Sequence, residues 1–318
     1  MAEYLHGFTL MGEDIELSID HPDADRIFKE AEAMIRDYEK RYSNSDPESE
    51  VVAINQAAGQ EVVRVSKDLY QLIKTGREIG LATNGIFNIA IGPITRLWHR
   101  GFSDVPFPDK AQIDTKLDRL NPADIMLNDY QQSVFLAKAG MALDLDVISK
   151  GYFADRLKRF FFEKGVHSGM INLGNNLITL GQANEGIDGN WLVKIPDPLT
   201  YGGQTLGELR TQDQAVVISS INERKLKVGT KYYHHLFDAR TGYPIDSQLA
   251  SVIIVSKQAI DGEIWSTVLF SQAPEKALQW LNQAQGIEGI LITKEKQVIV
   301  SEKLKDKVSL CEDIEMHG

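Results

Sequence analysis

Residues 232–244 hold the densest set of chemically active side chains in the sequence, Tyr-Tyr-His-His-Leu-Phe-Asp-Ala-Arg-Thr-Gly-Tyr-Pro. Histidine is the side chain whose ordinary pKa lies nearest neutrality. A His at the end of an alternating segment, followed by Asp238 and a tight turn, therefore suits an acid or a base at the edge of a cleft. The same pattern is also typical of a plain hairpin that turns between residues 239 and 244. This segment alone leaves both interpretations open.

A second candidate lies at residues 144–152, Asp-Leu-Asp-Val-Ile-Ser-Lys-Gly-Tyr, where an expected strand ends in carboxylates and a helix begins. Free N–H groups at a helix start, with Lys150 beside them, can bind a phosphate group. Asp144 could accept a hydrogen bond from a nucleotide hydroxyl or amide. The alternative is an Asp that caps the helix next to a solvated lysine.

Glu263 and Thr267 are four residues apart in an expected helix, so both oxygens project from one face and could reach one hard cation. Two ligands do not hold Mg²⁺, so a site here also needs a backbone carbonyl and phosphate oxygens of a bound nucleotide. Solvated helix residues often show the same spacing, and the pair alone is weak support for a metal.

Two loops could approach a ligand closely. Residues 172–176, Asn-Leu-Gly-Asn-Asn, contain residue types that tolerate positive φ. Residues 85–98 offer aromatic side chains and backbone donors that could flank a planar ring. A plain turn and a buried loop would have the same compositions.

The composition excludes several classes of protein. Lys and Arg total 34 against 45 Asp and Glu, which gives a formal net charge of −11 and makes nucleic acid an unlikely partner. The single cysteine, Cys311, excludes an intrachain disulfide and a thiolate metal cluster. The N-terminus has no basic start followed by an apolar core, and no apolar window approaches the length of a membrane span. We therefore expect a soluble, cytoplasmic protein, with an exported or lipid-anchored form whose leader has been removed as the alternative.

Periodicity predicts mixed strands and helices. We expect strands at residues 14–19, 125–127, 134–136, 142–145, 170–173, 191–195, 215–219, 251–255, 289–293 and 298–300. We expect helices over residues 21–42, 66–83, 147–164, 260–270 and 274–284. Because the elements lack the regular βαβ alternation of a doubly wound sheet and no linker divides the chain, we predict an α+β fold in a single compact domain over residues 1–318, with the site between two halves.

Taken in order, these segments resemble the ApbE family of FAD-dependent protein flavinyltransferases, and the resemblance spans nearly the whole chain. The matching motifs stand at residues 11–13, 85–94, 144–152, 172–176, 235–244 and 262–267. The resemblance implies a T-fold-like α+β unit. It also implies an activity: Mg²⁺-dependent transfer of FMN from FAD to a Ser or Thr hydroxyl of a target redox protein, with release of AMP.

The resemblance also implies a role for individual residues. His235 takes the proton of the acceptor hydroxyl. The metal is bound by the backbone carbonyl of Val147 and by Glu263 and Thr267. The residues implied to line the FAD site are Met11, Ile86, Phe87, Asn88, Asp144, Lys150 and Phe237.

The sequence departs from the family pattern at positions of the implied site. Glu263 and Asn88 each stand where the family has Asp, and Asp146 stands where the family has Gly. These changes keep an alternative open, a degenerate FAD-binding protein or a slow FAD pyrophosphatase that yields FMN and AMP. An unrelated sugar or peptide hydrolase using His235 and Asp238 ranks last, because no nucleophile elbow or carboxylate pair accompanies them.

Overall fold

The structure is a computed structural model that describes residues 4–99, 108–183, 188–200, 203–221, 225–228, 231–234 and 236–318. His235, the predicted proton acceptor, lies outside the described residues. The chain divides into two compact units. Unit 1 contains Met1–Arg36, Lys150–Asn222 and Ser247–Gly318, and unit 2 contains Asp37–Ser149 and Glu223–Asp246. We describe each unit by itself, and the single domain over residues 1–318 stays a prediction.

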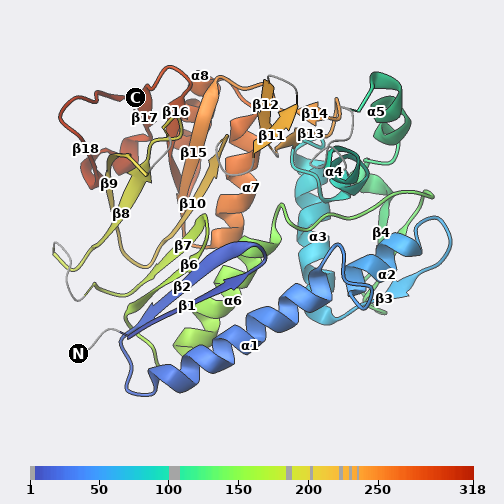
Figure 1. Cartoon of the computed structure of the whole chain (residues 1–318), viewed down its shortest axis with the longest axis horizontal. Coiled ribbons are helices and arrows are strands. Elements are labelled where there is room, and N and C mark those ends of the chain that lie inside the picture. The colour runs from blue at the N-terminus through green and yellow to red at the C-terminus, as the bar shows by residue number, and fades with distance from the viewer. Residues whose placement is uncertain are drawn as a thin grey trace. The chain divides into compact units, whose positions relative to one another are not determined.

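Unit 1 is built on a nine-stranded sheet (Figure 1). Neighbouring strands are antiparallel, except that the last pair, β17 and β19, is parallel. In spatial order the strands are β1 (Tyr4–Leu10), β2 (Glu13–Ile19), β6 (Gly169–Leu173), β7 (Asn176–Leu180), β10 (Ala215–Ser220), β15 (Leu249–Ser256), β16 (Ile287–Thr293), β17 (Val298–Val300) and β19 (Met316–His317).

Both faces of the sheet centre are covered, which explains why β15 is apolar almost throughout and buries every residue. On one face, Val216 and Ile253 pack in a cluster with Val193 and Leu209 of a smaller sheet. That sheet contains β8 (Trp191–Pro196), β9 (Thr205–Thr211) and β18 (Val308–Leu310). On the other face α7 (Ala259–Phe270) packs on β10 and β15 (Figure 1). The contact is so close that a Cβ on Gly262 would lie 2.4 Å from the Val217 side chain.

The other helices of unit 1 follow the predicted pattern. α1 (Ala24–Tyr42) buries Ile27, Ala31 and Ile35, which recur at helical spacing. Residues 37–42, the C-terminal part of α1, belong to unit 2. The remaining helices are α6 (Ser149–Glu163), α8 (Pro274–Gln283) and the short 3₁₀ helix η4 (Glu302–Lys307).

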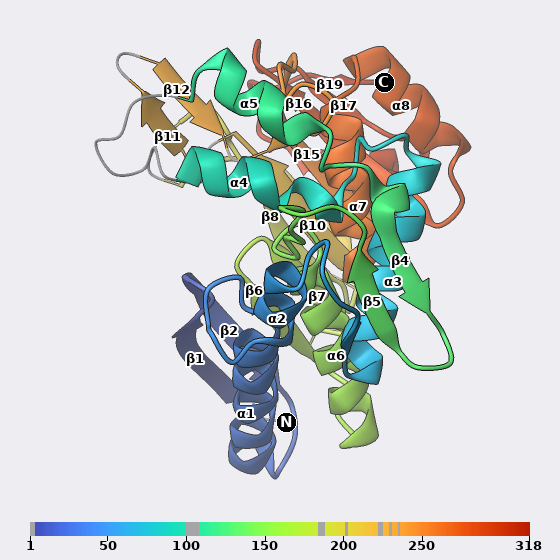
Figure 2. The ribbon, with the colours of Figure 1, turned by 90° about the vertical axis from the view of Figure 1, so that its right-hand side faces the viewer.

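Unit 2 combines short helices with small sheets. Figure 2 shows the hairpin of β4 and β5 beside α3, where Arg77 Nε donates to the Ile125 carbonyl over 2.7 Å. Its helices are α2 (Glu50–Gln56), α3 (Lys67–Ala82), η1 (Ile89–Ile91), α4 (Gly92–His99), α5 (Lys110–Leu117) and η3 (Pro122–Asp124). Its strands are β3 (Val63–Arg64), β4 (Ile125–Asn128), β5 (Ser133–Leu136), β11 (Lys225–Val228), β12 (Lys231–His234), β13 (Phe237–Asp238) and β14 (Tyr243–Pro244).

The α+β class is confirmed, and one predicted strand is wrong. Residues 142–145 are buried, but they form no strand. The backbone of Leu143 instead exchanges two hydrogen bonds with the Asn55 side chain, and the Asp144 N–H donates to the Ile89 carbonyl over 2.8 Å. A side chain and a 3₁₀ turn thus replace the neighbouring strand that a ladder requires.

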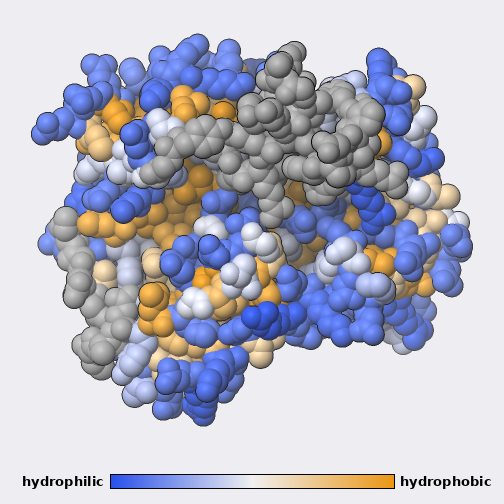
Figure 3. All heavy atoms as spheres, viewed as in Figure 1, coloured by the Kyte–Doolittle hydropathy of each residue, from blue (hydrophilic) through white to orange (hydrophobic). Residues whose placement is uncertain are grey.

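None of the helices in the described part of the chain has the length and apolar character needed to cross a membrane. Among the coloured residues on the face drawn in Figure 3, hydrophilic residues predominate and hydrophobic residues show as separate patches. This agrees with a charged fraction of 25% in the sequence.

Candidate functional site

The predicted site residues that the structure describes fall into two groups, one in each unit. In unit 1 the group consists of Met11, Lys150, Glu263 and Thr267. Lys150, in the first turn of α6, places its Nζ 3.5 Å from Oε1 of Glu13, and the Lys150 side chain is 17% exposed. An ammonium has three N–H donors, so a partly buried lysine that makes this one long ion pair among the described residues retains donors for an anionic ligand.

Glu263 supplies the carboxylate of this group and is buried, with 8% of the residue exposed. Asn176 Nδ2 donates to Glu263 Oε1 over 2.7 Å. Burial raises the pKa of Glu263, while the charge of Lys150 and the hydrogen bonds from Asn176 and the Gly151 backbone act in the opposite direction. The charged form of Glu263 is therefore disfavoured unless a further positive group lies beside it.

Gly151 lets α6 approach the buried carboxylate. A Cβ at this position would lie 2.7 Å from the Ala259 carbonyl oxygen and 2.8 Å from Cγ of Glu263. Any larger residue would push the start of α6 away from α7. The Lys-Gly pair of the motif at residues 144–152 thus combines a cation at residue 150 with close helix packing at residue 151.

The donor set in unit 1 fits a hard cation. Such ions take oxygen ligands. Glu263 offers a carboxylate, and the Thr267 hydroxyl, which donates to the Glu263 carbonyl over 3.0 Å, retains oxygen lone pairs. Oδ1 of Asn176 is buried and accepts no hydrogen bond from the described residues. Within the described part of the chain, no three or more His, Cys, Asp and Glu residues come together as a metal site, so ligands of other kinds are needed to complete one.

Met11 lies in the tight turn between β1 and β2. Met11 and Gly12 both have positive φ, 54° and 71°, as a two-residue hairpin of this kind requires. Gly174, in the turn between β6 and β7, also has positive φ, and a Cβ there would lie 3.0 Å from Oε2 of Glu13. Both glycine-containing motifs therefore serve as tight turns, and the second lies against Glu13.

In unit 2 the predicted site residues are Ile86, Phe87, Asn88, Asp144, Val147 and Phe237. Asp144 is buried, and both of its carboxylate oxygens are engaged. Oδ2 accepts from the Thr95 hydroxyl over 2.6 Å. Oδ1 accepts from Asn44 Nδ2 over 2.9 Å and from the Asp146 N–H over 3.1 Å. The carboxylate is thus held in one orientation by three donors.

The segment from Ile86 to Asn88 presents little side chain to a ligand. Phe87 is fully buried, and Asn88 is 7% exposed. Asn88 Nδ2 donates to the Leu120 carbonyl over 2.6 Å, and its Oδ1 accepts from the Ala90 N–H over 2.8 Å, which caps η1. Ile86 is the partly exposed member. The side chain at position 88 therefore stabilises the loop, and its predicted contact with FAD stays a prediction.

Val147 and Phe237 pack against a hydrophobic cluster that contains Trp98. The rings of Trp98 and Phe237 have centroids 5.5 Å apart, and Trp98 Nε1 donates to the Gly242 carbonyl over 2.8 Å. This bond fixes the turn of the β13–β14 hairpin, which confirms the predicted turn after Asp238.

Asp238 is paired within that turn. Arg240 contacts its carboxylate, with Nη2 to Oδ2 at 2.7 Å. Burial works to raise the pKa of Asp238, but the hydrogen bonds and charge of Arg240 lower it overall. Within the described residues, the Asp238 carboxylate is thus held by Arg240 of its own turn.

Four residues that contact the predicted site residues had no predicted role: Glu13, Asn44, Thr95 and Asn176. Asn176 belongs to a recognised motif, and Glu13 follows the Met-Gly turn, so proximity along the chain was a usable signal. Asn44 and Thr95 reach Asp144 from positions 100 and 49 residues away. Nothing in their local sequence indicates that contact.

Comparisons with known proteins agree on one family. A family model described as "ApbE family" matches residues 11–291. A Klebsiella pneumoniae protein named FAD:protein FMN transferase is 36% identical over 94% of this chain and 92% of its own length. A Treponema pallidum protein of the same name is 28% identical over 88% of this chain and 80% of its own length.

Solved structures show the same fold. The ApbE protein of Thermotoga maritima matches with a TM-score of 0.87 and 23% identity, over 96% of this chain and 99% of that one. The flavin transferase ApbE of Vibrio cholerae matches with a TM-score of 0.82 and 19% identity, over 96% and 99% of the two chains.

Proposed function

The chain belongs to the ApbE family, and on this premise we propose that it is a FAD:protein FMN transferase, which moves FMN from FAD to a Ser or Thr hydroxyl of a target redox protein. The observation that carries the proposal is the 36% identity to a relative of that name over 94% of the chain. The partly buried Lys150 and the buried Glu263 in unit 1 are consistent with a site for a charged phosphate substrate.

In this reaction the acceptor oxygen attacks the FMN phosphorus of FAD. A new phosphoester bond forms, the anhydride bond to the AMP phosphate breaks, and AMP leaves with the bridging oxygen. We assign the removal of the hydroxyl proton to His235. Lys150 binds the negatively charged diphosphate, and Asp144 accepts a hydrogen bond from the nucleotide while its donors keep it oriented.

We propose that Mg²⁺ is bound by Glu263, Thr267 and the backbone carbonyl of Val147. A bound Mg²⁺ would neutralise the negative charge that develops on the diphosphate oxygens. The burial of Glu263 supports this assignment, because a carboxylate whose charge is disfavoured by burial gains most from a cation.

The proposal is tested with purified protein, FAD, Mg²⁺ and a flavoprotein that carries an acceptor Ser or Thr. We expect the intact mass of the acceptor to rise by one FMN. The same flavoprotein with its acceptor residue changed to Ala is the control and is expected to stay unmodified. Release of AMP with an unmodified acceptor would favour the pyrophosphatase alternative, and absence of both products would contradict the proposal.

A further inference from the structure

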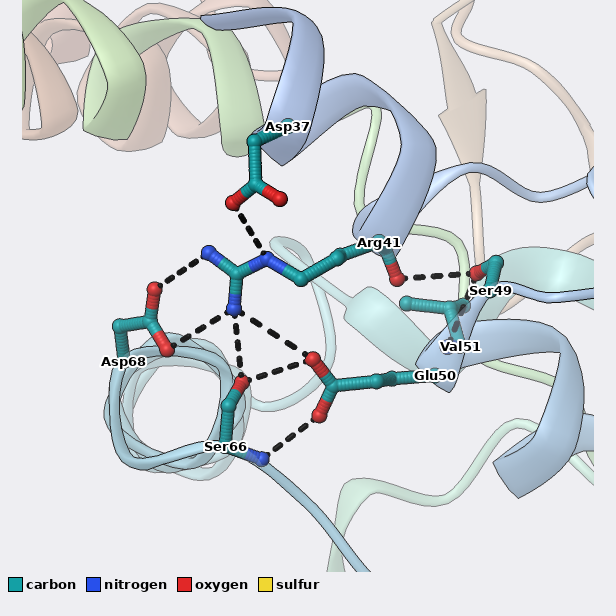
Figure 4. Close-up of polar contacts among 7 residues, drawn as sticks. All are labelled: Asp37, Arg41, Ser49, Glu50, Val51, Ser66 and Asp68. Atoms are coloured by element: carbon teal, nitrogen blue, oxygen red, sulfur yellow. Dashed lines mark hydrogen bonds and ion pairs between the residues drawn. The ribbon is translucent and has the colours of Figure 1, made fainter. Parts of the chain in front are cut away.

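Arg41, in the last turn of α1, makes the densest set of polar contacts in the described part of unit 2 (Figure 4). Its Nη2 lies 2.9 Å from Oδ2 of Asp68, and its Nε lies 2.8 Å from Oδ2 of Asp37. Its Nη1 donates to Ser66 Oγ over 3.1 Å and to Glu50 Oε1 over 3.4 Å. One guanidinium thus connects three carboxylates and a hydroxyl.

These contacts join the ends of three helices. Glu50 is the first residue of α2, and Ser66 and Asp68 stand at the start of α3. Glu50 also accepts from the Ser66 N–H over 2.6 Å and from the Ser66 hydroxyl over 2.8 Å. Anionic side chains are favoured at helix starts. The starts of α2 and α3 therefore share one cation, the Arg41 guanidinium at the end of α1.

The network is half-buried and strongly paired. The side chains of Arg41, Glu50 and Asp68 are 26%, 23% and 18% exposed. Burial opposes the charge of Arg41, but the hydrogen bond and charge of Asp68 raise its pKa above the ordinary value. Burial likewise works to raise the pKa of Asp68, but the hydrogen bonds from Arg41 and Ser66 lower it well below the usual range. The pairing therefore favours the charged form of both groups.

The network also fixes the loop at residues 43–49, which leads from α1 to α2. Ser49 Oγ lies 3.0 Å from the Arg41 carbonyl oxygen and 2.6 Å from that of Ser43. It also accepts from the Val51 N–H group at the start of α2 (Figure 4) and from the Val52 N–H group. Ser49 therefore connects the start of the loop, at Arg41 and Ser43, to the start of α2. The Arg41 side chain in turn contacts Glu50, the first residue of α2.

Near its start, at Asn44, the loop contacts a residue of the predicted FAD site. Asn44 Nδ2 donates to Asp144 Oδ1 over 2.9 Å and lies 3.4 Å from Asp146 Oδ1. Asn44 and Thr95 supply the two side-chain donors that the structure gives Asp144. The orientation of Asp144 thus depends on a loop whose position depends on the helix ends around Arg41.

We propose that Arg41 is a positioning residue of the substrate site: it holds the loop at residues 43–49 so that Asn44 orients the Asp144 carboxylate. This inference rests on the proposed function, in which Asp144 contacts FAD. Arg41 itself touches no substrate. Arg41 acts on the site through Asn44. A positioning role therefore predicts that loss of Arg41 has no further effect on FAD binding once Asn44 is removed, whereas general stabilisation does not.

A double-mutant cycle tests the route. We measure the Kd for FAD, and the KM and kcat of transfer, for Arg41→Met, Asn44→Ala and the double variant. Because misplacement of a binding group weakens substrate contacts, we expect each single variant to raise the Kd and KM for FAD by about tenfold, with a smaller change in kcat. The double variant should bind FAD no worse than Asn44→Ala alone, since both act along one route.

Two further variants control for folding. Arg26→Met removes an exposed arginine of the same helix, which pairs with Asp23, and should leave all three constants unchanged. Arg41→Lys keeps the charge but loses the forked contacts, and it should raise the Kd for FAD while circular dichroism stays native-like. If Arg41→Met does not fold, the Kd of folded Arg41→Lys decides the test.

Additive effects in the cycle, or an unchanged Kd for FAD in folded Arg41→Met or Arg41→Lys, would overturn the positioning role. A wild-type protein that binds FAD without modifying an acceptor would contradict the proposed function instead. The Kd comparison would still test Arg41 in that case, so the two failures are distinguishable.

Discussion

At the scale of single residues, Glu263 combines burial, a raised pKa and a place beside Lys150 and Asn176. A buried carboxylate costs stability, so its presence suggests a use for its charge. We predict that Glu263→Gln raises the Mg²⁺ concentration for half-maximal transfer by about tenfold or more, because a neutral amide is a weaker ligand than a carboxylate. The metal-free variant should melt at the same or a higher temperature than the wild type.

The matched control is Glu275→Gln, which neutralises an exposed glutamate in the first turn of α8. Titration of transfer activity with Mg²⁺ and calorimetric melting supply the two readouts. An unchanged Mg²⁺ dependence in Glu263→Gln would remove this residue from the set of metal ligands.

His235 carries the proposed proton transfer, and its variant separates catalysis from binding. We predict that His235→Ala lowers the transfer rate by about 10²- to 10⁴-fold, the range of a lost general base. The Kd for FAD should stay close to that of the wild type. His234→Ala, which removes an imidazole one residue away, is the control. Wild-type turnover in His235→Ala would refute the role.

At the scale of elements, α7 depends on a cap from another helix. Its N-cap residue, Gln258, makes no side-chain cap hydrogen bond. Asp155 of α6 accepts instead from the Ala259 and Ile260 N–H groups over 2.8 and 3.0 Å. Burial raises the pKa of Asp155 to about 6, although these two hydrogen bonds oppose the rise. The helix that carries Glu263 and Thr267 is thus anchored at its start by a titrating group.

This anchor predicts a pH dependence of stability. Because the folded pKa of Asp155 exceeds the ordinary value of 3.8, the folded state binds more protons than the unfolded state between about pH 4 and 6. The contribution of Asp155 to the free energy of unfolding is therefore present below pH 4 and is lost as the pH rises through 6. Asp155→Asn removes this titration.

Urea unfolding at pH 5 and pH 7.5 checks the prediction. The stability of the wild type relative to Asp155→Asn should fall by about 1 to 2 kcal/mol between these pH values. Glu163→Gln, an exposed site on the same helix, should show no such change. A difference independent of pH would contradict the assignment.

Helices and strands with a strong apolar periodicity could be predicted from the sequence. The helix over residues 21–42 and the strand over residues 251–255 have strong apolar patterns, and both are present as α1 and β15. α2 was missed because its Val-Val-Ala-Ile sequence does not distinguish a short helix from a strand; the Ser49 cap was the usable signal. Residues 142–145 have a strand pattern, but tertiary partners satisfy their backbone groups instead.

At the scale of the whole molecule, the α+β class and the family resemblance came from motifs that lie far apart in the chain. The motifs indicated Glu263, Lys150 and Asp144, because local residue types limit the chemistry of each segment. Sequence reasoning could not supply Asn44, Thr95 and the Arg41 network, because these contacts depend on the packing of distant segments. The role of a side chain also depends on its partners in the fold. Asn88 is an example, because its two hydrogen bonds, to the Leu120 carbonyl and from the Ala90 N–H, stabilise its own loop.

The most direct test of the proposed function is the stoichiometry of its two products. Wild-type protein is incubated with FAD, Mg²⁺ and an acceptor flavoprotein, and released AMP and FMN-modified acceptor are quantified in the same sample. Transfer predicts one AMP for each modified acceptor, and no free FMN. AMP released together with free FMN, and an acceptor of unchanged mass, would contradict it.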